Sequence, residues 1–213
     1  MRVAEIWRFP VKSMAGERLA RAELGLAGVA GDRLVLVRGA GGRVVTARTH
    51  PLLLGHRATL SASGQPLVDG RPWDSAEVAR DVRAAAGPGA RLERAEVAER
   101  FDILPLLVAT DGAIEAFGHD GRRLRPNLVI AGVPGLAERE WPGRRLRIGD
   151  ALIGALKLRQ RCVMTTYDPD TLEQDASVLR GIQREFGGLL ALDCFVERGA
   201  KIAEGDGVEL VDS

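Results

Sequence analysis

The sequence predicts an α+β protein in which β-strands predominate. Short apolar runs bounded by Gly, Pro and Asp recur along the chain, 26 of the 213 residues are glycine, and only 4% are aromatic. Short runs separated by turn residues are typical of strands rather than of long helices. A first half rich in hairpin patterns precedes a half that mixes strands with short helices, which is the α+β arrangement.

Five runs predict strands: residues 33–37, 43–47, 128–131, 151–158 and 208–211. The first two are joined by Arg-Gly-Ala-Gly-Gly, whose glycines at positions 39, 41 and 42 can adopt positive φ. We therefore expect the first two runs to form a hairpin.

Three segments predict helices: residues 74–86, 111–117 and 175–186. The first has Asp74 as its expected N-cap with Glu77 three residues on, and the second is expected to be capped by Thr110 or Asp111. The third carries an apolar stripe on one face and ends at a Gly-Gly pair.

A Gly-Pro-Gly sequence at positions 87–89 follows the first predicted helix. Such a break is the natural place for a boundary between compact units, and 213 residues are enough for two small domains. The sequence thus predicts one domain over residues 1–90 and a second over residues 91–213.

The charges nearly balance, with 30 Lys+Arg against 29 Asp+Glu. A net charge of +1 gives no overall attraction to nucleic acid or to an anionic membrane, so any anion site is local. No apolar run approaches the roughly 20 residues needed to span a bilayer, and the first ten residues lack an apolar targeting segment. We expect a soluble, cytoplasmic protein without nucleic-acid or membrane partners.

Several classes of catalytic site lack their sequence motif. The chain has no G-x-G-x-x-G, no phosphate-binding G-x-x-x-x-G-K-[ST] and no G-x-S-x-G. Its three histidines have no metal-ligand spacing, which disfavours a zinc site. The two cysteines are expected to be reduced thiols, because one disulfide could not hold a chain of this length together.

Cys162 is the residue with the clearest chemical potential. It lies between Arg159 and Arg161 on one side and Thr165 on the other, and nearby guanidinium groups favour the thiolate, which is both nucleophile and soft metal ligand. Val163 follows it in an apolar run, so from the residues alone a reactive thiol and a packed core cysteine are equally supported. Cys194, inside a strand-like run, is expected to be a packing residue.

Seven segments, in order along nearly the whole chain, resemble the MOSC-domain family with its N-terminal β-barrel partner, and in particular bacterial relatives of the mitochondrial amidoxime-reducing component. They are FPVKS at 9–13, GDR at 31–33, VTARTHPLL at 45–53, LRPNLVIAG at 124–132, IGD at 148–150, RCVMTTYDPDT at 161–171 and GDGVEL at 205–210. The resemblance implies an N-terminal β-barrel-like domain packed against a MOSC β-barrel domain with a few short helices.

The resemblance also implies the cofactor, which is molybdenum held by molybdopterin. In relatives the cysteine of RC-x-x-TT is the protein ligand of the metal, so Cys162 is the expected catalytic residue and metal ligand. The phosphate of the pterin requires several charge-assisted donors. The expected cofactor-binding residues are Lys12, Ser13, Arg33, Arg48, Arg125, Asn127, Arg161, Cys162 and Thr165. Lys12 and Arg33 are expected to face solvent when no cofactor is bound, so that their loss would hardly affect the fold.

The function implied is that of a molybdenum-dependent oxidoreductase that reduces N-hydroxylated or other oxygenated small molecules. No second cofactor motif occurs, so electrons are expected from a separate donor protein. The alternative is a sulfur-transfer or cofactor-carrier module that uses Cys162 as a persulfide or ligand without turnover. Ile103 and Leu104 stand where amidoxime-reducing relatives carry hydroxyl residues, a departure that bears on the substrate.

Overall fold

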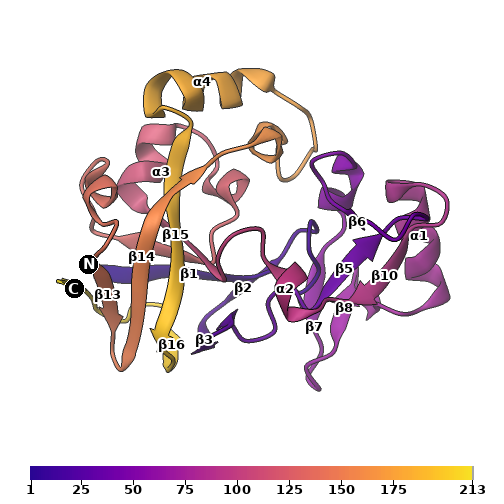
Figure 1. Ribbon diagram of the computed structural model, residues 1–213, viewed down its shortest axis with the longest axis horizontal. Helices are drawn as coiled ribbons and strands as arrows, with labels where there is room; N and C mark the ends of the chain where they lie inside the picture. Colours follow the sequence, from indigo (N-terminus) through magenta and orange to yellow (C-terminus); the bar gives the residue numbers. More distant parts are fainter. Residues whose placement is uncertain (213) are drawn as a thin grey trace.

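The computed structural model describes residues 1–212, and the protein is mainly β: 38% of it is strand and 24% helix. Along the long axis of the molecule, one end is built around a large mixed sheet with α3 and α4, and the other around small sheets and α1 (Figure 1). The α+β class expected from the sequence is confirmed.

The large sheet has eight strands, in the order β17-β13-β14-β15-β11-β12-β1-β2. Their bounds are Arg2–Arg8 (β1), Glu17–Leu19 (β2), Leu106–Thr110 (β11), Leu128–Ala131 (β12), Arg145–Ile148 (β13), Ala151–Gln160 (β14), Leu189–Arg198 (β15) and Val208–Val211 (β17). All pairs are antiparallel except β11 with β12. The first strand of the chain therefore lies inside a sheet completed by the last.

Two helices accompany this sheet, α3 (Asp111–Phe117) and α4 (Ala176–Phe186). α3 connects the parallel strands β11 and β12, and its N-cap Thr110 accepts a hydrogen bond from the backbone N–H of Ala113 at 3.1 Å. α4 is capped by Asp175 and ends at Gly187 in the left-handed conformation. Both helices match their predicted positions.

The other end of the molecule is made of short strands. β5 (Val35–Arg38) lies between β10 (Arg91–Arg94) and β6 (Val44–Val45), which confirms the expected hairpin. β7 (Ala58–Leu60), β8 (Pro66–Val68) and β9 (Arg71–Pro72) form a second sheet there. A third small sheet, of β16 (Lys201–Ala203), β3 (Arg21–Gly25) and β4 (Gly28–Val29), lies instead at the large-sheet end and contributes to its apolar cluster (Figure 1). The remaining short helices are η1 (Pro51–Gly55), α2 (Val97–Arg100), η2 (Gly121–Leu124), η3 (Ala137–Glu140) and η4 (Val163–Thr166).

α1 (Ala76–Ala86) starts later than the sequence predicted. Its N-cap is Ser75, whose hydroxyl accepts a hydrogen bond from the backbone N–H of Val78 at 3.3 Å, so the prediction of Asp74 as the cap was wrong. Ser and Asp are about equally good caps, and a pattern of adjacent candidates does not distinguish them.

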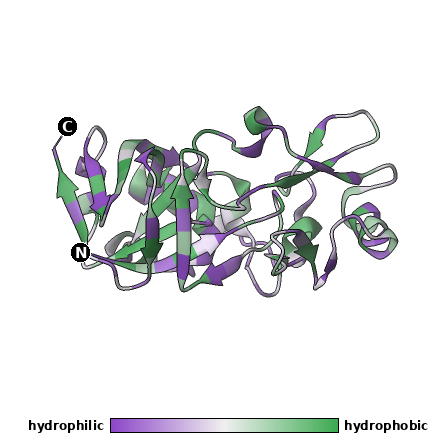
Figure 2. Cartoon of the chain, turned by 90° about the horizontal axis from the view of Figure 1, so that it is seen from below, coloured by the Kyte–Doolittle hydropathy of each residue, from purple (hydrophilic) through white to green (hydrophobic). Residues whose placement is uncertain are grey.

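Three apolar clusters form the core. One fills the large sheet, a second joins α3 and α4 to that sheet, and a third joins α1 to the short strands of the other end. Hydrophobic and hydrophilic residues alternate along the strands (Figure 2), as expected for elements with one face turned to a core. Cys194 is fully buried in the first cluster, which confirms that it is a packing residue, and burial raises its pKa.

Candidate functional site

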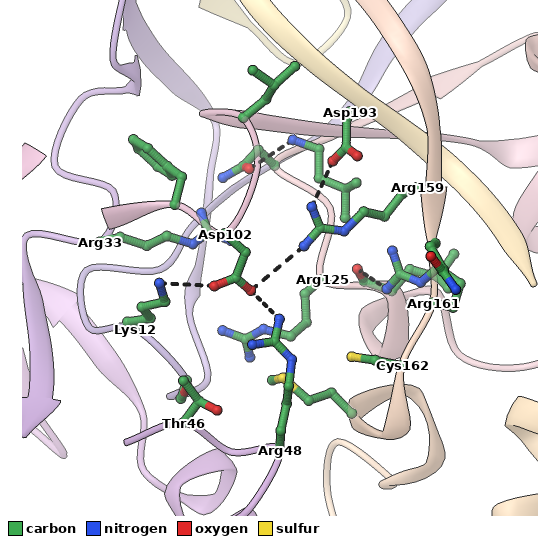
Figure 3. Close-up of a pocket in the computed structure, with 18 of the residues that line it drawn as sticks. Lys12, Arg33, Thr46, Arg48, Asp102, Arg125, Arg159, Arg161, Cys162 and Asp193 are labelled. Atoms are coloured by element: carbon green, nitrogen blue, oxygen red, sulfur yellow. Dashed lines mark hydrogen bonds and ion pairs between the residues drawn. The ribbon is translucent and has the colours of Figure 1, made fainter. Parts of the chain in front are cut away.

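A pocket lies between the two ends of the molecule, where the apolar clusters give way to charged side chains (Figure 3). Its volume is about 90 Å³. The residues that line it are Lys12, Ser13, Arg33, Thr46, Arg48, Phe101, Asp102, Leu104, Leu107, Arg123, Leu124, Arg125, Asn127, Arg159, Gln160, Arg161, Cys162, Met164 and Asp193. Segments up to 180 residues apart in the sequence thus meet at one place.

Cys162 follows the last residue of β14 and is the N-cap of η4, with extended backbone (φ −137°, ψ 179°). Its thiol is free, partly exposed and turned into the pocket (Figure 3). Thr165 holds the turn, because its hydroxyl donates to the Cys162 carbonyl at 2.9 Å. Arg48 lines the same pocket: burial opposes its charge, but Asp102 and then Cys162 outweigh burial and raise the pKa of Arg48.

Asp102 is the centre of the charge network in the pocket (Figure 3). Its carboxylate lies 3.0 Å from Lys12 Nζ and 3.7 Å from Arg159 Nη2, and it also accepts a hydrogen bond from Arg48. Burial alone would raise the pKa of Asp102, but the hydrogen bond and charge of Lys12, followed by those of Arg48, lower it to about 2. Asp102 is therefore ionised at neutral pH.

Two arginines of the pocket are enclosed by protein atoms. Burial, and then the charge of Arg33, lower the pKa of Arg125 to about 9, while burial, and then Arg159, lower that of Arg161 to about 10. Both still carry a positive charge at neutral pH. Arg125 stacks on Phe9, with its Cζ 4.3 Å from the ring centre.

Arg161 is only partly paired. Its Nη2 donates to the Leu124 carbonyl at 2.7 Å, but its Nε and Nη1 are buried without a hydrogen-bond partner among the described residues. Native proteins rarely leave buried donors unpaired, because each costs about 1–3 kcal/mol and more on a charged group. Since Arg161 lines the pocket, its free donors are suited to an anionic or acceptor ligand.

The backbone is strained at three residues of the pocket. Among residues 1–212, six non-glycine residues have positive φ, and three of these line the pocket: Ser13 (73°), Arg33 (49°) and Arg125 (55°). Such conformations cost energy and persist where the surrounding structure enforces them. Their gathering around one cavity marks it as a functional site.

Asp32 and Asn127 fix these strained turns to one another. Asp32 is fully buried and accepts hydrogen bonds from the backbone N–H of Phe9 at 2.6 Å, from Arg33, and from Asn127 Nδ2 at 3.2 Å. The Asn127 amide also donates to the Trp7 carbonyl and accepts from the Leu107 N–H. Its polar atoms thus already serve the scaffold, and its contact with a cofactor stays a prediction.

Eight of the nine residues expected from the sequence to bind a cofactor line the pocket: Lys12, Ser13, Arg33, Arg48, Arg125, Asn127, Arg161 and Cys162. Thr165 does not line it, and is fully buried behind Cys162. The expectation that Lys12 and Arg33 face solvent was wrong, because their side chains are only 13% and 17% exposed and both are paired with carboxylates.

Sequence reasoning left four charged residues of the pocket out of the expected site: Asp102, Arg123, Arg159 and Asp193. Arg159 Nη1 donates to Asp193 Oδ1 at 2.9 Å, and the other Asp193 oxygen is buried without a partner among the described residues. Arg159 was visible as a neighbour of Cys162 three residues away, but a carboxylate in a basic pocket gives no local sequence signal. Asp102 comes just before Ile103, which marked a departure from the relatives.

Comparison with known proteins identifies two family matches. The family described as "MOSC N-terminal beta barrel domain" matches residues 1–98, and that described as "MOSC domain" matches residues 109–209. Mitochondrial amidoxime-reducing component 1 of Homo sapiens is 27% identical over 79% of this chain and 67% of its own length. Mitochondrial amidoxime reducing component 2 of Macaca fascicularis is 28% identical, with the same coverage of both chains.

Among solved structures, the YUAD protein from Bacillus subtilis shares the fold, with a TM-score of 0.55 over 100% of this chain and 96% of that one, at 15% identity. Within residues 1–212, no helix combines the length and apolar character that crossing a membrane requires.

Proposed function

Since the chain belongs to the MOSC-domain family, with a MOSC N-terminal beta barrel domain ahead of the MOSC domain, we propose that it is a molybdenum-cofactor-dependent oxidoreductase. Its substrates are small molecules with an N-hydroxyl or other reducible oxygen. The family is associated with the molybdenum cofactor, and relatives at 27–28% identity are named for amidoxime reduction.

The observation that carries the proposal is the pairing of a partly exposed thiol with an unsatisfied guanidinium in one pocket. Cys162 offers the soft sulfur ligand that molybdenum takes from proteins, and the free Nε and Nη1 of Arg161 offer donors to an anionic group beside it. The donor chemistry of the pocket therefore fits a metal held by an anionic pterin.

Lys12, Ser13 and Arg33 would hold the phosphate of the cofactor, with Arg125 between them and the metal end. Ammonium and guanidinium groups bind phosphate oxygens by charge-assisted hydrogen bonds. A cavity of about 90 Å³ is smaller than the roughly 300 Å³ at which ligand pockets commonly begin. Binding of the whole cofactor would thus require the ion pairs of Asp102 with Lys12 and Arg48 to open.

Held by Cys162 and the basic residues of the pocket, the cofactor would supply oxygen-atom transfer from the substrate, with electrons from a separate donor protein. The residues of the chain would bind and orient the cofactor and the substrate. Asp102, ionised at neutral pH, acts as counter-ion and hydrogen-bond acceptor rather than as proton donor. Arg48 is paired with Asp102 and lines the same pocket as Cys162, so it supplies positive charge there.

The test is to produce the protein in cells able to make molybdopterin, and to measure molybdenum, pterin and the reduction of benzamidoxime by reduced methyl viologen. We expect close to one molybdenum per chain and formation of benzamidine. Cys162→Ser is expected to lose the metal–thiolate absorption and at least 100-fold in activity, the order of loss when a group essential for catalysis is removed.

Cys194→Ala is the matched control, because that thiol is buried in the core and should leave metal content unchanged. Stoichiometric persulfide on Cys162 without molybdenum would replace the proposal by the sulfur-transfer or carrier alternative. Equal behaviour of wild type and Cys162→Ser in every measurement would refute both.

A further inference from the structure

A second, larger cavity lies on the other side of Arg125. Its volume is about 410 Å³, within the size range of small-molecule pockets. The lining residues are Trp7, Phe9, Ala15, Gly16, Leu54, Gly55, Arg57, Arg122, Arg125, Pro126, Pro169 and Asp170. None of Lys12, Ser13, Arg33 and Cys162 is among them, so both ends of the proposed cofactor belong to the first pocket and not to this one.

A narrow cavity of about 40 Å³ lies between the two. It shares Arg123, Arg125 and Met164 with the pocket of Cys162. It shares a larger set with the outer cavity: Ala15, Leu54, Arg122, Arg125 and Pro169. Tyr167 lines this neck and neither of the larger spaces. The three spaces thus adjoin one another, with Arg125 common to all of them.

The small volume of the neck limits what it can hold. About 40 Å³ holds only a few atoms, since one water molecule needs about 10–15 Å³ on the same measure. A small head such as an N-hydroxylated carbon fits this space, whereas an aromatic ring must remain in the outer cavity. The geometry therefore favours a substrate with a compact reducible head and a bulky tail.

The walls of the outer cavity indicate the chemistry of that tail. Trp7 and Phe9 provide aromatic surface, and Leu54 and the two prolines provide aliphatic surface. The lining contains three arginines, Arg57, Arg122 and Arg125, but a single carboxylate, that of Asp170, so the cavity favours a negatively charged ligand. Arg122 is already paired with Asp170 at 2.6 Å and with Asp120, whereas the exposed guanidinium of Arg57 makes no hydrogen bond or ion pair within residues 1–212.

We propose that the outer cavity is the substrate-binding subsite, that it selects aromatic molecules with a carboxylate on the end opposite the reducible head, and that Arg57 recognises this carboxylate. The assignment of the head rests on the proposed function. Recognition of the aromatic carboxylate does not rest on the proposed function, because the outer cavity is separate from the proposed cofactor site.

Binding is tested on the purified protein by calorimetric titration with naphthalene-2-carboxylate and with naphthalene-2-carboxamide, which has the same shape without the charge. We expect the carboxylate to bind about five- to tenfold more tightly, the gain typical of one charge-assisted hydrogen bond at a partly exposed site. Arg57→Gln is expected to abolish this preference and to leave carboxamide binding unchanged. Arg43→Gln, which removes an exposed arginine in the turn after β5, is the control.

Turnover is tested on the molybdenum-loaded protein with benzamidoxime and 4-carboxybenzamidoxime. We expect kcat/KM to be higher for the carboxylated substrate, and Arg57→Gln to remove the difference by raising KM. Tyr167→Trp, which enlarges a side chain of the neck alone, is expected to lower kcat/KM for both substrates without weakening naphthalene-2-carboxylate binding.

The two proposals fail separately. Absence of any amidoxime reduction, with carboxylate binding that still depends on Arg57, would refute the oxidoreductase and leave the subsite standing. Equal affinity for carboxylate and carboxamide, or a preference that survives in Arg57→Gln, would refute the subsite even if the enzyme is active.

Discussion

Asp102 shows how a single residue can set the electrostatics of the site. One carboxylate contacts Lys12, Arg48 and Arg159, and so reduces the mutual repulsion of cations that come from different parts of the chain. The same carboxylate competes with any anion that enters the pocket. Its effects on stability and on anion binding therefore have opposite signs.

We predict that Asp102→Asn raises the affinity for inorganic phosphate and lowers stability. Because the folded pKa of about 2 lies below the ordinary value of 3.8, the ionised carboxylate stabilises the fold above about pH 4, and this contribution is lost as the pH falls toward 2. After allowance for solvent screening we expect a loss of about 1 kcal/mol at pH 7. Phosphate titration and urea denaturation at pH 7 and pH 2.5 measure both effects.

The stability difference between Asp102→Asn and wild type should fall to about a third at pH 2.5, where Asp102 is still mostly ionised in the folded protein but almost neutral in the unfolded chain. Asp170→Asn, at an exposed carboxylate of the outer cavity, is the comparison variant. A difference that is as large at pH 2.5 as at pH 7, or phosphate affinity that falls, would show that charge is not the cause.

At the scale of elements, the glycine in α3 and the glycine in α4 differ in how much space surrounds them. A Cβ on Gly112, in α3, would lie 2.3 Å from the Val133 carbonyl oxygen and 2.4 Å from that of Gly135. A Cβ on Gly181, in α4, would meet nothing within 4 Å. The first glycine is required by close packing of α3 against the loop after β12, and the second is not.

We predict opposite effects for the two alanine variants. Gly112→Ala should lower the free energy of unfolding by about 1–3 kcal/mol because the backbone atoms it meets cannot move freely. Gly181→Ala should raise it by about 0.5–1 kcal/mol, the difference in helix propensity. Urea denaturation of both variants measures this, and stabilisation by Gly112→Ala would mean that the loop after β12 is more compliant than its geometry indicates.

The sequence was informative about elements and less so about the site. Periodicity located β12, β14, β17, α3 and α4, since each carries a complete local signal of alternation or capping. β1 was not predicted, because its role depends on β12, more than a hundred residues away. Similarly, the order of the motifs predicted nine site residues, and eight of them line one pocket. The pocket positions of Asp102 and Asp193 depend on contacts that no local pattern encodes.

At the scale of the whole molecule, the pocket interrupts the hydrophobic core. The cluster around α1 is separate from the two that belong to the large sheet. The contacts across this boundary, which we call the seam, include the hydrogen bond from Arg125 Nη2 to the Met14 carbonyl at 2.7 Å and the packing of Met164 on the α1 cluster. The division into residues 1–90 and 91–213 stays a prediction. Strand pairs join residues on either side of position 90, because β10 pairs with β5 and β12 pairs with β1.

We predict that the two ends unfold together at low ionic strength and separately in 1 M NaCl, where charge interactions across the seam are screened. Trp73 packs on the α1 cluster and Trp141 lies in the large-sheet core. Variants in which one of these two is the sole tryptophan, with Trp7 also replaced, therefore report on each end. We expect the two single-tryptophan variants to have equal unfolding midpoints at low salt, and the Trp73 variant to have the lower unfolding midpoint at high salt. Equal midpoints in both conditions would mean that the seam is not held by charge.

The chain positions that build the pocket also decide when it can form. Lys12 and Asp193 line the same cavity, and the N–H of Val208 donates a hydrogen bond to the Met1 carbonyl at 2.9 Å. Residues near position 1 therefore cannot complete their contacts until residues near position 200 have been synthesised. At about 5–20 residues per second, a ribosome needs roughly 10–40 s to deliver both. The pocket therefore does not exist until residue 193 has been synthesised and folded, and any ligand it takes is acquired after that point, when binding also serves as a check that these distant segments have come together.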